Sequence, residues 1–125
     1  MSKSQLPVGP VEACNPSPRV REPLSADAAG ELAVVFKALS DPIRLRLLSS
    51  IASRSGQEAC VCDLSEGIDL TQPTISHHLK VLRSAGLLTS ERRASWVYYR
   101  VVPEALRQLS DALSLEAGAL AEVNA

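Results

Sequence analysis

The segment 71–102 constrains the fold more than any other, because it joins a capped amphipathic helix to a pair of short strands. Thr71 is a favoured N-cap residue, and Gly86 is a typical residue just past the end of a helix. Apolar side chains recur between them at helical spacing, as Ile75, Leu79 and Leu82. Residues 87–91 and 96–102 then read as two strands of a hairpin around a polar turn. One helix followed by one hairpin is therefore expected.

Helix signals also precede this segment. The first helix is expected to follow the N-cap Ser25 and to end near Ser40. Asp41 and Pro42 then read as an N-cap and a first-turn proline, which begin a second helix. A short third helix is expected over residues 60–66.

A last helix is predicted after Pro103. Its leucines recur at helical spacing, as Leu106, Leu109, Leu113 and Leu120. Aromatic residues make up only 3% of the chain, so the core must be aliphatic, a composition that favours helices over a sandwich or barrel. The order of four helices, a hairpin and a helix predicts a mainly α fold with a β-hairpin. Two short helices joined by the linker 68–70 and followed by a hairpin are the parts of a winged helix-turn-helix, a DNA-binding arrangement.

The 125 residues fit a single domain with one flexible extension. Residues 1–23 hold five of the eight prolines, so we expect an N-terminal arm there, a domain over 24–120 and a tail at 121–125. No apolar run reaches the roughly 20 residues that a membrane span needs, and the start lacks the order of a signal peptide. We therefore expect a cytoplasmic protein without membrane contact.

Charge is unevenly distributed, although the net charge is only −1. Between residues 71 and 100, five basic side chains stand against the single acidic residue Glu91. After Pro103, acidic residues outnumber basic ones. This distribution favours a protein that presents one face to phosphates and uses another face for a different purpose.

The outer face of the helix over 71–85 is polar and partly basic. Together with the basic turn 92–95 it supplies the candidate DNA contacts, which are Gln72, Thr74, Ser76, His77, Lys80, Arg92 and Arg93. Gln72 can form two hydrogen bonds with adenine, whereas Lys80 suits a phosphate. An ordinary solvated helix face is the alternative. His78 lies at the flank of the apolar stripe, where a packing role is expected.

The chain has an odd number of cysteines, namely Cys14, Cys60 and Cys62. In a reducing compartment this argues against a disulfide framework and for thiol chemistry or metal binding. The alternative is that a free cysteine is simply a small buried apolar residue. Sulfur ligands favour arsenite, antimonite or another thiophilic ion over magnesium or calcium.

Three stretches of the chain carry a family resemblance. Residues 38–48 read ALSDPIRLRLL, residues 71–82 read TQPTISHHLKVL, and residues 85–88 read AGLL. Together they resemble the ArsR/SmtB family of bacterial metal-sensing repressors. The resemblance implies a homodimer, paired through its first and last helices, that binds double-stranded operator DNA with an inverted repeat. It also implies repression of a metal or metalloid resistance operon and no enzymatic activity.

The stretch Cys60-Val61-Cys62-Asp63-Leu64 resembles the cysteine motif of arsenic-sensing members of that family. Those members can carry a third cysteine on the same helix, where this chain has Ser65 and Glu66. Cys14 is then the candidate third ligand, so the expected metal ligands are Cys14, Cys60 and Cys62. The resemblance implies arsenite or antimonite as the inducer, with cadmium, lead or zinc as alternatives.

The spacing of the cysteine pair predicts a mechanism. In an intact helix, residues two apart diverge by about 200°, so Cys60 and Cys62 could bind one ion only if that turn unwound. We therefore expect ligand binding to distort the start of this helix and to weaken operator binding. The main alternative is a thiol-redox regulator on the same fold. A small thiol enzyme or metal carrier is disfavoured, because no residue near the cysteines supplies a base.

Overall fold

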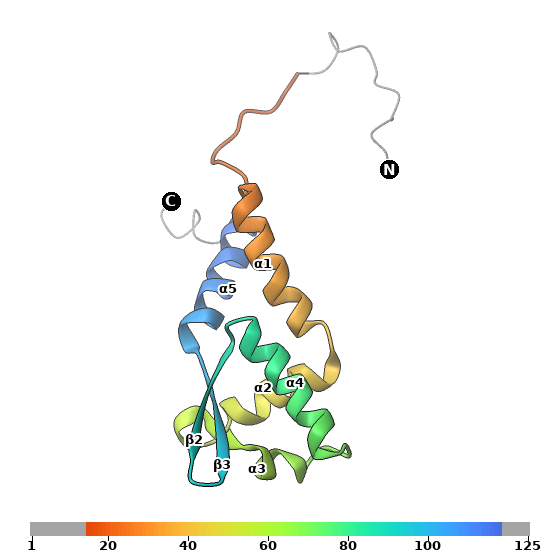
Figure 1. Cartoon of the computed structure of the whole chain (residues 1–125). Helices are drawn as coiled ribbons and strands as arrows, with labels where there is room; N and C mark the ends of the chain where they lie inside the picture. The colour runs from red at the N-terminus through yellow and green to blue at the C-terminus, as the bar shows by residue number, and fades with distance from the viewer. Residues whose placement is uncertain (1–14, 119–125) are drawn as a thin grey trace.

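The computed structural model describes residues 15–118, which form five α-helices and a small sheet (Figure 1). In chain order the elements are α1 (Ala26–Leu39), α2 (Pro42–Ala52), the 3-10 helix η2 (Ser55–Gln57), β1 (Glu58–Cys60), α3 (Val61–Ser65), α4 (Gln72–Ser84), β2 (Leu88–Arg93), β3 (Trp96–Val101) and α5 (Pro103–Glu116). The predicted mainly α fold with a hairpin is confirmed. None of the helices within 15–118 has the length and apolarity to cross a bilayer.

The helices begin where the sequence places polar N-caps. The Ser25 hydroxyl accepts a hydrogen bond from the Ala28 amide at the start of α1. Asp41 accepts from the Ile43 and Arg44 amides, at 2.8 and 3.2 Å, and so begins α2. At α4, Thr71 fills the same role. Each cap satisfies amides that the first helical turn leaves without a partner, so the three predicted helix starts are confirmed.

The core lies between α2, α3, α4 and the sheet. Its largest fully buried side chains are aliphatic: Leu47, Ile51, Leu64, Ile75, Leu79, Leu82, Leu87, Leu88 and Val101. The predicted stripe of α4 is confirmed, because its three apolar side chains are completely buried. This packing fixes α4 with its opposite face toward solvent.

The sheet has three strands in the order β1-β3-β2, one more strand than the sequence predicts. β1 pairs antiparallel with β3, and β2 pairs with β3 on the other side. A strand thus occupies Glu58–Cys60, and the third helix begins at Val61, not at Cys60 as expected. Three residues are too few to show the alternating pattern of a strand. Residues 58–60 form a strand because they pair with β3.

The hairpin turn is shorter than predicted. Arg92 and Arg93 belong to β2, and Arg93 pairs with Trp96 across the turn. Only Ala94 and Ser95 connect the strands, with Ala94 at a φ of 57°. The two arginines therefore lie on a paired strand and not in a free loop.

The helices α1 and α5 extend together from the end of the molecule that lies farthest from the hairpin turn (Figure 1). No residue of α5 is fully buried. Large apolar side chains are exposed on both helices, namely Val34, Phe36, Leu113 and Leu115. Residues 15–24 form neither helix nor strand, and Leu120, predicted to continue the last helix, lies outside the described residues.

Candidate functional site

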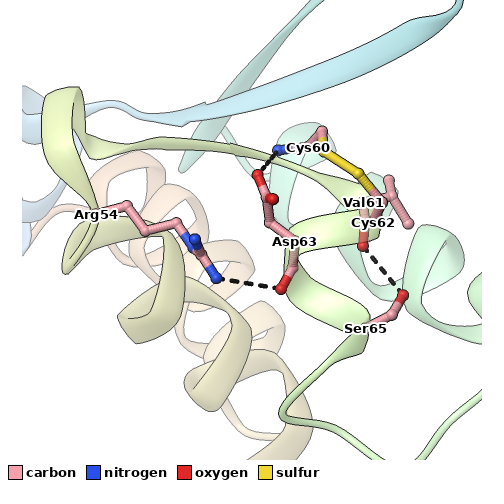
Figure 2. Close-up of a disulfide and its surroundings, with 6 residues drawn as sticks. All are labelled: Arg54, Cys60, Val61, Cys62, Asp63 and Ser65. Carbon is pink, nitrogen blue, oxygen red and sulfur yellow. Dashed lines mark hydrogen bonds between the residues drawn. A yellow bond between two sulfur atoms is a disulfide. The ribbon is translucent and has the colours of Figure 1, made fainter.

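Cys60 and Cys62 lie at the junction of β1 and α3. Cys60 is both the last residue of β1 and the N-cap of α3, with an extended φ of −90° and ψ of 165°. Cys62 lies in the first turn of α3. Their sulfur atoms form a disulfide, and their Cα atoms are 5.4 Å apart (Figure 2). The two side chains therefore converge on one point.

The premise that both cysteines lie inside the third helix is wrong, because Cys60 precedes α3 as its N-cap. The expected unwinding follows when both residues have helical dihedral angles, and only Cys62 has them. The extended backbone of Cys60 turns its side chain toward Cys62. Once the disulfide is reduced, the two thiols can therefore face one ligand, with Cys60 outside the helical turns of α3.

Asp63 completes a cluster of three potential ligands. Its Oδ2 accepts a hydrogen bond of 3.2 Å from the Cys60 amide, while the Cys60 sulfur accepts from the Asp63 amide in a reciprocal cap. Ligand atoms of Cys60, Cys62 and Asp63 all lie within 4.8 Å of one another. Two sulfurs and one carboxylate suit a thiophilic ion better than a hard one.

The surroundings of the cluster hold it in place and leave one side open. Cys60 is 4% exposed, whereas Cys62 and Asp63 are half-buried, so a small ligand can approach from their side. Arg54 donates a hydrogen bond of 3.1 Å to the Asp63 carbonyl, and the Ser65 hydroxyl donates to the Val61 carbonyl (Figure 2). Cys14, the third predicted ligand, lies outside the described residues.

The solvent-facing side of α4 carries most of the predicted DNA contacts. Among them Gln72, Thr74, His77 and Lys80 are exposed, and Ser76 is half-buried. The Thr74 hydroxyl lies 2.9 Å from that of Thr71, so it already has a partner within its own helix turn. A helix N-terminus with these exposed polar groups can meet base edges in a major groove.

The hairpin of β2 and β3 is the wing of this fold. The two predicted DNA contacts on it, Arg92 and Arg93, have different environments. Arg92 is exposed on β2. The Arg93 guanidinium instead forms ion pairs with Glu58 and Glu91 and lies over the Tyr98 ring, 4.5 Å from its centroid. Of the two arginines, Arg93 is thus already engaged inside the wing.

Two charged residues with structural contacts were not among the predicted site residues. Glu58 on β1 binds Arg93 and Arg100, which hold its pKa at about 2, well below its ordinary 4.5. No sequence signal pointed to Glu58, because β1 itself was not predicted.

Arg44 of α2 is the second such residue. Its guanidinium donates a hydrogen bond of 2.6 Å to the Ala38 carbonyl at the end of α1 and lies 3.3 Å from Nδ1 of His78 on α4. The half-buried His78 accords with its expected packing role.

Comparison with known proteins identifies relatives for the central part of the chain. A family model described as "Bacterial regulatory protein, arsR family" matches residues 41–90, which include the cysteine pair and all of α4. An arsenic resistance transcriptional regulator of Pseudomonas putida is 51% identical over 71 residues, 57% of this chain and 54% of that protein. The chain thus spans about half the length of that relative.

Two further relatives are covered more fully. The arsenical resistance operon repressor of Bacillus subtilis is 40% identical over 74 residues, 59% of this chain and 69% of the repressor. Among solved structures, the AntR antimony-specific transcriptional repressor shares 35% identity with a TM-score of 0.62, covering 85% of this chain and 96% of AntR. The chain therefore shares its fold with a transcriptional repressor, and the cysteine pair lies within the range that the family model matches.

Proposed function

Because this chain belongs to the ArsR family of bacterial regulatory proteins, we propose that it is a DNA-binding repressor of a metalloid-resistance operon. Arsenite or antimonite is the proposed inducer, and its binding to cysteine thiolates releases the protein from its operator. The observation that carries the proposal is the convergence of the Cys60 and Cys62 sulfurs beside Asp63.

The reduced cysteine pair has suitable chemistry for trivalent arsenic. Each thiol replaces one hydroxide of arsenite, which leaves as water, and the oxidation state of arsenic does not change. Two such exchanges leave one hydroxide on the arsenic, and a third thiol can replace it. We assign this third position to Cys14, carried by the arm 1–23 of the same subunit or of the partner subunit.

Release of DNA follows from the packing of α3 on α4. Leu64 of α3 and Ile75 of α4 belong to the same buried cluster, so the two helices cannot move independently. A bound arsenic atom sets the separation of the two sulfurs, and with it the geometry of the junction between β1 and α3. We propose that this change shifts α4 relative to the operator.

The proposed DNA contacts remain those of the exposed face of α4 and of the wing. They are Gln72, Thr74, Ser76, His77, Lys80, Arg92 and Arg93. A homodimer formed by α1 and α5 within the domain 24–120 presents two such surfaces to an inverted repeat. The apolar side chains exposed on these two helices support this pairing.

The test is a fluorescence-anisotropy titration of the reduced full-length protein with DNA from upstream of its own gene, repeated with arsenite, antimonite, cadmium, lead and zinc. We expect operator binding that is lost at about one arsenite per subunit. Unchanged operator affinity in the fully arsenite-loaded protein would falsify the proposal. Release by a divalent metal alone would replace the proposed inducer.

Cysteine variants locate the ligands in the same assay. The double variant C60S/C62S is expected to bind the operator and to ignore arsenite. C14S tests the contribution of the arm by itself. If Cys14 is the third sulfur ligand, C14S should bind arsenite more weakly and keep its operator affinity. Equal arsenite affinities of C14S and wild type would remove Cys14 from the site.

The disulfide between Cys60 and Cys62 favours a second candidate, a thiol-redox repressor on the same fold. In that reaction hydrogen peroxide takes two electrons and two protons from the thiols and becomes two waters, while the sulfurs form a bond. Release of the operator by peroxide without arsenite sensitivity supports this candidate. Release by arsenite from protein kept reduced supports the first.

A further inference from the structure

Glu58 binds both strands of the wing from a single carboxylate. Arg93 of β2 donates to its two oxygens at 2.5 and 3.0 Å, and Arg100 of β3 donates to Oε1 at 2.5 and 3.2 Å. The Glu58 side chain is 19% exposed, so water competes only weakly for these bonds. We call Glu58, Arg93 and Arg100 the wing clamp.

The wing clamp is joined directly to the cysteine pair by β1. Glu58 is the first residue of this three-residue strand and Cys60 is the last. In the register of the sheet, Glu58 lies opposite Arg100 and Cys60 lies opposite Tyr98. A displacement of Cys60 along or across the sheet therefore reaches Glu58 through two peptide units with no flexible loop between them.

The other end of the wing clamp lies beside the hairpin turn. Arg93 is the last residue of β2, opposite Trp96, and its guanidinium also lies over Tyr98. Glu91 contacts the same guanidinium at 2.8 Å, but from β2 itself. Of the two carboxylates that bind Arg93, only Glu58 ties it to the strand that carries a cysteine.

From these contacts we infer that Glu58 is a positioning residue that transmits ligand binding at Cys60 and Cys62 to the wing. The inference rests on the proposed function, and adds a path from the thiols to DNA that does not pass through α4. In this path, ligand binding moves the β1–α3 junction, Glu58 moves with β1, and the carboxylate carries Arg93 and Arg100 along. The wing then changes its orientation relative to the DNA backbone.

Trp96 offers a direct readout of the wing, because it is the only tryptophan of the chain and is 53% exposed opposite Arg93. Arsenite added to the reduced full-length protein without DNA is expected to shift or quench its emission. Glu58→Gln keeps the shape of the side chain and removes its charge. We expect this variant to bind arsenite, followed by the ultraviolet absorbance of arsenic–thiolate bonds, while most of the Trp96 response is lost.

Glu91→Gln is the matched control, since it removes the other carboxylate from Arg93 and leaves β1 connected. Its Trp96 response should equal that of the wild type. Operator titrations give the second measure, the ratio of operator affinities without and with arsenite. That ratio should fall roughly tenfold in Glu58→Gln, within the usual range of coupling between two sites, and stay unchanged in Glu91→Gln. If Glu58→Gln does not fold, Arg100→Gln removes one half of the wing clamp and should lose part of the response.

The outcomes separate this inference from the proposed function. Equal Trp96 responses and equal affinity ratios in wild type and Glu58→Gln overturn the coupling role of Glu58 and leave the repressor proposal intact. Arsenite binding by the wild type with no Trp96 response overturns it as well. Absence of arsenite binding by the wild type overturns the proposed function, and the inference with it.

Discussion

At the scale of single residues, Glu58 shows how a charged side chain gains a role from its neighbours. Hydrogen bonds from Arg93 and then Arg100 hold its pKa at about 2, against an ordinary value of 4.5. The hydrogen bond to Glu58, followed by the one to Glu91, raises the pKa of Arg93. Since the carboxylate is bound in its charged form in the folded protein, the wing clamp stabilises the fold at neutral pH and loses this contribution in acid.

The first prediction is a pH dependence of this stabilisation. Because the folded-state pKa of Glu58 is lowered, its contribution is fully present above about pH 4.5 and declines as the pH falls toward about 2. The free energy of unfolding in urea should therefore differ more between wild type and Glu58→Gln at about pH 6 than at about pH 3. The exposed Glu104→Gln serves as a control for loss of one negative charge. An equal difference at both pH values would contradict the lowered pKa.

The second prediction separates base reading from phosphate binding on α4. Gln72→Ala should weaken binding by about 1–3 kcal/mol on the native operator and relax the preference at one base pair. Lys80→Ala should weaken binding to all sequences alike and reduce the slope of log affinity against log salt by about one. Anisotropy titrations with native and point-mutated operators over a salt series measure both. Equal losses on all operators for Gln72→Ala would show that it reads no base.

Residue types and spacing were sufficient to find the cysteine pair and the exposed face of α4. They could not place the Arg93 side chain, because its position depends on Glu58, 35 residues earlier in the chain. They also misjudged how the two sulfurs meet, since the extended backbone of Cys60 follows from its pairing with Tyr98. Both features depend on contacts between residues distant in sequence, which local sequence patterns do not reveal.

At the scale of elements, caps and apolar periodicity predicted the helices well. Ser25, Asp41 and Thr71 each cap the helix that was assigned to them. The strand β1 was missed, because three residues without alternation carry no signal of their own. Yet β1 is the element that joins the cysteines to the wing, so the least predictable element is the one on which the coupling depends.

The third prediction concerns the N-cap of α4. Thr71 accepts a hydrogen bond from the Thr74 amide, so Thr71→Ala should lower the free energy of unfolding by about 1 kcal/mol. Thr71→Ser retains the capping oxygen and should remain close to the wild type. Urea denaturation followed by Trp96 emission measures both variants. If serine destabilises as much as alanine does, then the threonine methyl group and not the cap is responsible.

At the scale of the whole molecule, the buried core and the exposed apolar side chains of α1 and α5 lie in different parts of the described chain. The core lies between α2, α3, α4 and the sheet, and α1 and α5 extend beyond it (Figure 1). Both of these helices carry exposed large apolar side chains. Burial of such a surface is worth roughly 25 cal/mol for each Å². The proposed homodimer would cover this surface symmetrically.

The fourth prediction tests this pairing and its link to DNA. Leu113 of α5 is 52% exposed, and a charge there should oppose burial against a partner subunit. Leu113→Glu should therefore shift the protein toward monomer in sedimentation velocity at micromolar concentration. Operator affinity should fall more than tenfold in parallel, because a monomer binds only one half of an inverted repeat.

Leu45→Glu is the matched control, since Leu45 is 48% exposed but lies on α2. It adds the same charge at a similarly exposed leucine and should leave the sedimentation coefficient unchanged. A dimer that persists in Leu113→Glu would place the interface elsewhere on the molecule. A monomeric Leu113→Glu that still binds the operator with wild-type affinity would mean that one domain is sufficient for recognition, and the inverted repeat would then have no role in binding.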